Sequence, residues 1–229
     1  MTNALTAFIK DTNLPAFDEE AMAAAIDASQ EEEGYAQGGT TTFIDFSGKL
    51  NQYRVGKDKD PIDPEALFLL EPISATKGWI CWKGGKVVGR EEWPYLNKAA
   101  AISAEQLDDH GPYKEGDGWK PLRGFGCIAL DGSAGNYKFS SNAAGARNSI
   151  EGVLAEVSAQ VKRGQPSVPV IKFSSESFTA NDHTNWKPTF PIVAWVTREA
   201  AQAFFAGGSL DDLLAGKQPK KPKKPKKLK

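Results

Sequence analysis

Aromatic and basic side chains alternate in several short segments of this sequence, and this pairing suits the binding of single-stranded nucleic acid. The segments are Tyr53–Arg54, Trp79–Lys83, Arg123–Phe125 and Tyr137–Phe139, and Lys86 follows shortly after the second. Bases stack on exposed rings for roughly 1–3 kcal/mol each, while lysine and arginine follow the phosphates. These residue types therefore suit binding to a polyanion whose bases are unpaired.

The predicted strand 78–83 carries tryptophans on both of its faces. Because neighbouring strand residues point to opposite sides, Trp79 and Lys83 share one face and Trp82 lies on the other. The face with the lysine is the one expected in solvent. We therefore predict that Trp79 is the stacking ring and that Trp82 belongs to the core.

The last thirteen residues are the most basic part of the chain. Residues 217–229 contain eight lysines and no acidic residue, with prolines at three regularly spaced positions. Proline excludes a helix and favours an extended polyproline II chain, so the lysines are expected to contact polyanions with a steep salt dependence. A solubility tail, a contact with the acidic body, a membrane-surface tether and a nuclear signal are the alternatives.

The predicted nucleic-acid-binding residues come from the strand segments and from this tail. They are Tyr53, Arg54, Trp79, Lys83, Lys86, Arg123, Phe125, Lys138, Lys220, Lys221, Lys223, Lys224, Lys226 and Lys227.

Signatures of catalysis and of metal binding are missing from the sequence. The two cysteines, Cys81 and Cys127, and the two histidines, His110 and His183, are not clustered as zinc would require. Both cysteines are expected to be buried thiols. There is no Walker phosphate loop, dinucleotide-binding fingerprint or nucleophile elbow. We therefore predict a protein that is not an enzyme and has no catalytic residues, metal or cofactor.

The formal charge of −1 averages segments of unlike charge. We predict three parts: an acidic helical N-terminal arm at 1–39, a single β-barrel-like domain with terminal helices at 40–216, and a disordered basic tail at 217–229. Without the tail, the other 216 residues hold 20 basic and 29 acidic side chains. Such a body repels nucleic acid unless its cations gather on one face. With no long apolar run or leader, a cytoplasmic protein without membrane contact is expected.

The elements that would position the rings and cations are mostly strands. A hairpin is predicted from Thr41–Phe46 and Lys49–Val55, and a second one turns at Gly84–Gly85. The other predicted elements are strands at Leu67–Leu70, Leu122–Leu130, Tyr137–Ser140, Val168–Phe173 and Phe190–Val196, a polar linker at Thr179–Lys187, short helices at Ser103–Asp108, Thr197–Phe205 and Ser209–Ala215, and a long amphipathic helix at Asn142–Arg163 capped by Ser141 or Asn142.

This order of elements predicts a mainly β fold with α-helices. A five-stranded barrel of the OB-fold type, with extra strands, the long helix before the last two strands and flanking short helices, fits the order best. An α+β sandwich with the helix across an open sheet is the competing arrangement.

The element order, the alternation of rings with cations and the basic tail together resemble phage-encoded OB-fold single-stranded DNA-binding proteins, over about Thr40–Thr197. The segment Trp186–Trp195 is similar to the closing strand of uncharacterised phage early proteins. The resemblance implies binding to single-stranded DNA without sequence specificity, in phage replication or recombination in the host cytoplasm. RNA is an alternative ligand, replication or recombination proteins are implied partners, and oligomers are compatible with it.

One feature departs from this family. Its replicative members typically end in an acidic tail that recruits polymerase, whereas this chain ends in lysines. The recruiting role would then fall to Asp18–Glu33 or be absent. Two other functions stay open: an acidic, DNA-mimicking inhibitor of a host enzyme, and a phage accessory or structural protein whose tail contacts DNA.

Overall fold

The computed structural model describes residues 41–97, 102–131, 135–180 and 183–216. The predicted N-terminal arm and basic tail lie outside these residues. The described chain is mainly β with a few helices, which confirms the predicted fold class. No helix within the described ranges combines the length and apolar composition needed to cross a bilayer.

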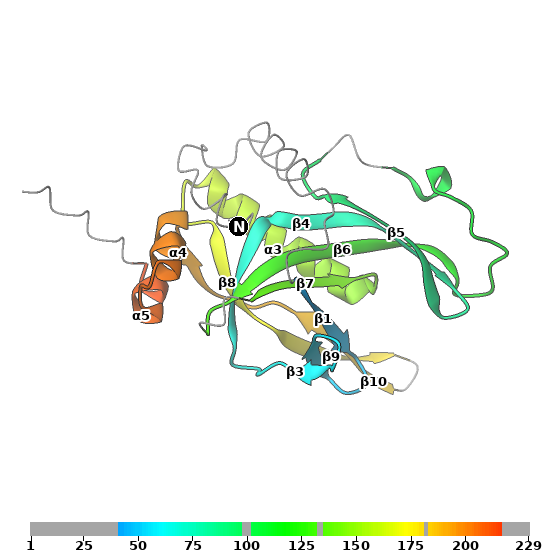
Figure 1. Cartoon of the computed structure of the whole chain (residues 1–229), viewed down its shortest axis with the longest axis horizontal. Coiled ribbons are helices and arrows are strands. Elements are labelled where there is room, and N and C mark those ends of the chain that lie inside the picture. The colour runs from blue at the N-terminus through cyan, green and yellow to red at the C-terminus, as the bar shows by residue number, and fades with distance from the viewer. Residues whose placement is uncertain (1–40, 98–101, 132–134, 181–182, 217–229) are drawn as a thin grey trace, which may run out of the picture.

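One mixed sheet organises the molecule (Figure 1). Its strands follow the order β11-β8-β4-β6-β7-β1-β2-β3, and β5 pairs with β4. Their bounds are β1 (Thr42–Ser47), β2 (Gln52–Val55), β3 (Asp60–Pro61), β4 (Leu67–Lys83), β5 (Lys86–Pro94), β6 (Gly118–Ala129), β7 (Asn136–Ser141), β8 (Val168–Lys172) and β11 (Ile192–Val196). A separate two-stranded sheet joins β9 (Ser174–Ala180) to β10 (His183–Thr189).

The described residues contain four helical segments, of which three follow β7. They are the 3-10 turn η1 (Ala104–Gln106), the long α3 (Ala144–Lys162), α4 (Arg198–Phe205) and α5 (Leu210–Leu214). As predicted, α3 follows β7 and precedes β8. Gly164, at φ 63°, ends it in the left-handed conformation that glycine adopts freely.

The predicted cap of α3 is wrong. Its N-cap is Ala143, and no side chain caps the first turn. Ser141 Oγ instead accepts a hydrogen bond from the Ala143 N–H at 3.2 Å, one residue before the helix. In contrast, α4 has a side-chain cap, because the Thr197 hydroxyl accepts a hydrogen bond from the Ala200 N–H at 3.2 Å.

Strand pairing in the main sheet is antiparallel except between β7 and β1. Strands β8, β4, β6 and β7 are antiparallel neighbours, and β1 from the N-terminal hairpin lies parallel to β7. Among the described strands, the two ends of the path, β11 and β3, do not pair with each other. Closure into a five-stranded OB barrel therefore stays a prediction.

The long strand β4 divides the sheet into a packed half and a projecting half. The predicted strands at Leu67–Leu70 and Gly78–Lys83 are one strand, with an irregularity in its pairing to β6 between Glu71 and Thr76. Beyond it, residues 76–83 and 118–124 together with β5 project from the body (Figure 1). We call this projecting part the β-extension.

The β-extension depends on glycine at two kinds of position. At Gly78 a side chain would place its Cβ 1.9 Å from the Glu91 carbonyl oxygen, so only glycine lets β4 and β5 approach this closely. The turn between them uses Gly84 and Gly85, at φ 56° and 76°. Two positive φ angles suit a tight hairpin turn, which confirms the second predicted hairpin.

Two apolar clusters hold the body together. The larger lies between the sheet and α3 and contains a group of rings that includes Phe125, Phe139, Phe173 and Phe190. The smaller joins β8 and β11 to α4 and α5. Burial of each such ring stabilises the fold by about 2 kcal/mol. These two clusters therefore account for much of the stability of the body.

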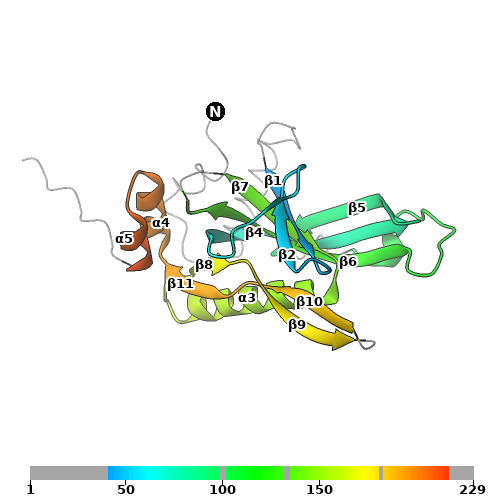
Figure 2. The same cartoon turned by 90° about the horizontal axis from the view of Figure 1, so that it is seen from below.

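The predicted polar linker Thr179–Lys187 is wrong, because this region forms the β9–β10 hairpin (Figure 2). Its two strands are mostly polar, and their large rings are Phe178 and Trp186. The base of the hairpin is fixed to the body. The Tyr53 hydroxyl donates to the Ser174 carbonyl at 2.6 Å, and the Ser149 hydroxyl donates to the Pro188 carbonyl at 2.8 Å.

Candidate nucleic-acid interface

The face of the β-extension that carries Trp79 and Lys83 is covered by residues 102–117, which we call the strap. The indole N–H of Trp79 donates to the Ile102 carbonyl at 2.9 Å. The ammonium group of Lys83 donates to the carbonyls of His110 and Gly111, at 2.6 and 3.0 Å. The prediction that this face lies open to solvent is wrong, because both side chains hold the strap.

Further contacts seal the same face. The Trp119 indole N–H donates to the Asp108 carbonyl at 2.9 Å. The Tyr113 hydroxyl accepts from the His110 N–H at 3.0 Å and lies 3.6 Å from Cys81 Sγ. Cys81 is fully buried beneath this contact. Sequence alternation therefore placed Trp79 on a definite face but did not show what covers that face.

Two predicted stacking rings belong to the core. Tyr53 is 7% exposed and Phe125 is 1% exposed, and both pack in the cluster under α3. Burial raises the pKa of the Tyr53 hydroxyl far above its usual range. Neither ring presents a face on which a base could stack in this conformation, so we leave both out of the interface.

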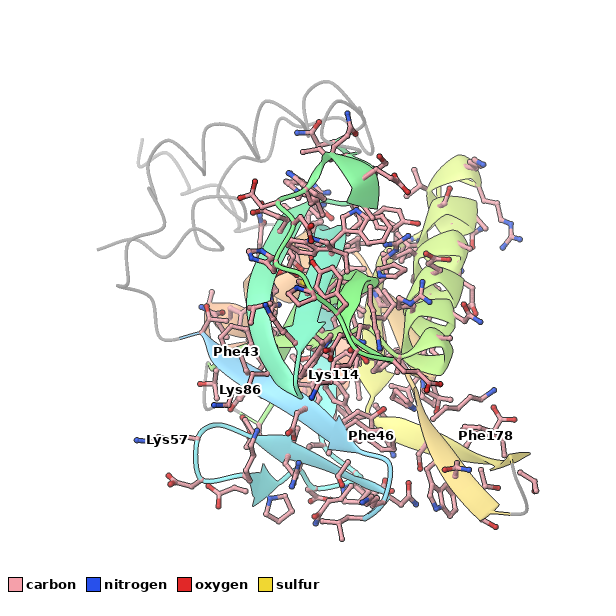
Figure 3. All side chains as sticks on the ribbon, turned by 90° about the vertical axis from the view of Figure 1, so that its right-hand side faces the viewer. Phe43, Phe46, Lys57, Lys86, Lys114 and Phe178 are labelled. Atoms are coloured by element: carbon pink, nitrogen blue, oxygen red, sulfur yellow. The ribbon has the colours of Figure 1, made fainter. Side chains whose placement is uncertain are left out.

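The predicted cations other than Lys83 fall into four groups. Arg123 pairs with Glu151 of α3 at 2.8 Å, on the core side of the sheet. Lys86 is exposed at the tip of the β-extension (Figure 3). Arg54 and Lys138 lie on the sheet face away from α3, and each pairs with a carboxylate described below. The six predicted tail lysines lie outside the described residues.

The second tryptophan of β4 opens onto a cleft. Trp82 lines a hollow of about 1090 Å³ between the β-extension, the start of α3 and the two hairpins β1–β2 and β9–β10. The other rings and the cations along it are Phe46, Phe178, Trp186, Arg90 and Lys187. In Figure 3, Phe46 projects from β1 and Phe178 from β9, near one end of α3. Trp82 is only half-buried and belongs to neither apolar cluster, so the prediction that it is a core residue is wrong.

The Trp82 indole N–H is buried and, among the described residues, finds no acceptor. A buried donor without a partner costs about 1–3 kcal/mol. This cost sets Trp82 apart from Trp79, whose N–H is satisfied by the strap.

The start of α3 gives the cleft a positive end. Its first-turn N–H groups have no intrahelical acceptor, no side chain caps them, and the first turn carries no acidic residue. A helix N-terminus of this kind favours anions. Lys187 lies against it: a Cβ at Gly145 would be 2.9 Å from the Lys187 Cβ. Lys187 also pairs with Glu176 of the same hairpin, at 2.9 Å.

A carboxylate beside the cleft holds two cations. Glu92 lies 2.8 Å from Arg90 and 3.0 Å from Lys138, and it accepts a hydrogen bond from the Thr76 hydroxyl at 2.8 Å. Burial alone would raise the pKa of Glu92, but the two cations and the hydroxyl lower it below its ordinary value. Arg90 also donates to the Ser140 hydroxyl at 3.0 Å. The cluster keeps one net positive charge.

A second carboxylate on the same sheet face repeats this arrangement. Asp45 lies 2.9 Å from Arg54 and 2.8 Å from Lys59. Partial burial would raise the pKa of Asp45, and its two cationic partners outweigh that effect and lower it. Each of the two carboxylates therefore fixes the positions of two cations and leaves one positive charge over.

The acidic charge of the chain is not spread over the folded body. Residues 1–40 hold one basic and eight acidic side chains, whereas residues 41–216 hold 19 basic and 21 acidic ones. The body is therefore almost balanced in charge. Four of its 19 cations, Arg54, Lys59, Arg90 and Lys138, lie around the two doubly paired carboxylates.

Several residues of the cleft were not predicted from the sequence. Trp186 was not predicted as a binding residue because the segment Thr179–Lys187 was interpreted as a polar linker, and Phe178, just before that segment, was assigned to no element. Phe46 and Arg90 carried no local signal, because their meeting depends on strands distant in sequence. No family model, curated protein or solved structure matches this chain. The resemblance to phage single-stranded DNA-binding proteins therefore remains a prediction.

Proposed function

We propose that this protein binds single-stranded DNA without sequence specificity and is not an enzyme. The observation that carries the proposal is the lining of the cleft, where the rings of Trp82, Phe46, Phe178 and Trp186 accompany Arg90 and Lys187 around the uncapped start of α3. Proteins that bind single strands without sequence preference combine such rings with a positive groove.

Different groups of the cleft contact the bases and the phosphates. Phe178 is 44% exposed and offers a free ring on the β9–β10 hairpin, and Trp82 stands on the opposing β-extension. Bases stack between these walls. The phosphates face Arg90, Lys187 and the N–H groups of α3. The attraction between these groups and the phosphates becomes stronger as water is displaced from the cleft. Every base has a face that can stack on a ring. This arrangement therefore favours unpaired strands and does not discriminate between bases.

The biological setting belongs to the same proposal. A role in phage replication or recombination in the host cytoplasm, with proteins of that machinery as partners, is supported by the resemblance in sequence alone. The basic tail would add sequence-independent contacts to the phosphates. RNA is the second ligand to test, since the rings and cations of the cleft do not by themselves distinguish the two sugars.

The decisive experiment compares two exposed phenylalanines. Phe178→Ala removes a ring in the cleft, and Phe205→Ala removes a ring on α4 that is 36% exposed and lies outside the cleft. With a fluorescent oligothymidine in low salt, Phe178→Ala should weaken binding about 5- to 100-fold, and Phe205→Ala should leave it unchanged. Equal affinities of all three proteins would overturn the proposal.

A shortened chain separates the cleft from the tail. A chain that ends at Gly216 should retain binding and should show quenching of its tryptophan fluorescence by the oligonucleotide. Loss of all binding with the tail would show that only the lysines contact DNA, as in the accessory-protein alternative. An inhibitor that mimics DNA would bind no oligonucleotide with either chain.

A further inference from the structure

The most exposed aromatic ring on the described sheet lies outside the cleft. Phe43 of β1 is 56% exposed, whereas its neighbour Ile44 is 3% exposed and packs in the core under α3. Phe43 therefore stands on the sheet face that points away from α3. A phenylalanine there contributes almost nothing to folding, because its ring stays in contact with water.

Strand register places cations around this ring. In the parallel pairing of β1 with β7, Phe43 is the partner of Lys138. Two residues further along β1, on the same face, Asp45 is the partner of Arg54. Paired strand residues point to the same side of a sheet, so the ring has Lys138 beside it and the Asp45–Arg54 pair next along the strand.

The two doubly paired carboxylates flank Phe43. Glu92 holds Lys138 and Arg90, and Asp45 holds Arg54 and Lys59. Four cations thus face two carboxylates around one exposed ring, and the surface keeps a positive excess. We call the set Phe43, Asp45, Arg54, Lys59, Arg90, Glu92 and Lys138 the Phe43 face.

The Phe43 face is continuous with the cleft. Asp45 and Arg90 line the cleft and also belong to the Phe43 face, and Ser140, which accepts a hydrogen bond from Arg90, lines the cleft as well. A strand that leaves the cleft on this side meets Arg90 and Lys138 before it reaches the ring. This path of the nucleic-acid strand requires no movement of the described residues.

We infer that the Phe43 face is a second binding subsite for single-stranded nucleic acid, occupied by the part of a strand that extends beyond the cleft. A base stacks on Phe43, and the neighbouring phosphates contact Lys138 and Arg54. The inference rests on the proposed function, because the cleft must hold the first nucleotides. It adds that affinity grows with strand length through this particular face.

A length series with two variants tests the subsite. Oligothymidines of about 4 and about 15 nucleotides bracket the range of site sizes known for single-strand binders. Phe43→Ala should weaken binding of the longer strand about fivefold or more and change binding of the shorter strand less than twofold. Phe178→Ala should weaken both, and Phe205→Ala should weaken neither. The thermal midpoint of Phe43→Ala should equal that of the parent, since the ring is exposed.

The outcomes separate the two ideas. If Phe178→Ala acts and Phe43→Ala leaves both lengths unchanged, the subsite is wrong and the cleft stands. If Phe43→Ala weakens both lengths alike, the ring belongs to the first site and the extension is wrong. If Phe178→Ala and Phe43→Ala are both without effect, the proposed function fails together with the subsite. If Phe43→Ala weakens self-association of the protein and leaves DNA binding unchanged, the ring belongs to a contact between copies of the protein and the subsite is wrong.

A charge variant gives an independent reading. Arg54→Gln leaves Lys59 on Asp45 and removes one phosphate contact. The slope of log affinity against log salt for the longer strand should become shallower by about 0.7, and the slope for the shorter strand should not change. Equal slopes for variant and parent with the longer strand would contradict a phosphate contact at Arg54.

Discussion

Trp79 and Trp82 stand three residues apart on β4 and point to opposite faces of the β-extension. Each face also carries a long cation, Lys83 on the first and Arg90 on the second. On the first face, the strap accepts the indole N–H and the ammonium group through its backbone carbonyls. On the second face, the indole N–H has no acceptor among the described residues, and the arginine borders an open cleft.

The comparison shows that residue type alone does not decide whether a ring and its neighbouring cation are covered. A segment of the chain covers the pairing of ring and cation on one face, and the pairing on the other face borders a cleft. The covering strap supplies backbone carbonyls, which are the acceptors that tryptophan and lysine need. The predictions below test this difference, beginning with the largest expected effect.

Trp79→Ala should be the most damaging substitution on the covered face. It removes a half-buried ring and the hydrogen bond to Ile102, and the free energy of unfolding should fall by about 3 kcal/mol. Urea denaturation followed by circular dichroism measures this change. Oligonucleotide affinity of the folded variant should equal that of the parent. A variant of normal stability that no longer binds DNA would reverse the assignment of the two faces.

Phenylalanine substitutions isolate the indole N–H groups. Trp79→Phe should lower the free energy of unfolding by about 1 kcal/mol, because the Ile102 carbonyl loses its donor. Trp82→Phe removes a buried donor without an acceptor, so stability should stay constant or rise by about 1 kcal/mol. Thermal and urea unfolding of the pair give the comparison. Equal losses in both variants would mean that Trp82 is satisfied in solution.

The two half-buried carboxylates of β4 and β5 should respond to pH with opposite signs. The pKa of Glu92 lies below its ordinary value of 4.5, so its charged form stabilises the fold above that pH and this contribution is lost as the pH falls through the lowered pKa. The pKa of Glu71 is raised by burial to about 7, with Arg198 partly opposing the rise. Its contribution is complete below pH 4.5 and is lost as the pH rises through 7.

Single substitutions expose these opposite slopes. Glu71→Gln should remove a decline in stability between pH 4.5 and 7, and Glu92→Gln should remove a decline below pH 4.5. Each slope is at most about 1.4 kcal/mol per pH unit. Urea unfolding at pH 3.5, 5 and 8 for the parent and both variants measures them. Parallel pH curves for the parent and Glu71→Gln would contradict the raised pKa.

Lys83→Met should produce the smallest effect. It preserves the length of the side chain and loses the hydrogen bonds to His110 and Gly111, so the free energy of unfolding should fall by about 1 kcal/mol or less. Lys86→Met, at the exposed tip, is the matched control and should change nothing. Limited proteolysis of the strap should be faster in Lys83→Met alone. Equal cleavage rates in the two variants would show that Lys83 does not hold the strap.

Local sequence signals were sufficient for most of the elements. The alternation in 42–55 and the Gly84–Gly85 turn indicated two hairpins that the structure contains. The apolar stripe that includes Ile150 and Val157 indicated α3, whose end at Gly164 is as expected. These signals are local because hydrogen bonding and side-chain direction within a strand or helix depend on neighbours a few residues away.

The candidate site was less predictable than the elements around it. Arg54 and Lys138 lie on the Phe43 face, each paired with a carboxylate, but Tyr53 and Phe125 are core residues. Trp79 and Lys83 hold the strap. The sequence shows which residues share each face of a strand. It contains no local signal for which face a distant segment will cover.

By itself, the sequence determined most of the strands and the long helix, the uneven charge of its segments and the residues that share each face of a strand. Only the tertiary structure decided that the strap covers Trp79, that the β9–β10 hairpin and the start of α3 enclose a cleft at Trp82, and that two carboxylates gather cations beside Phe43. The physical reason is range. Side-chain alternation follows from backbone geometry within a strand, whereas exposure depends on contacts between segments that are far apart along the chain.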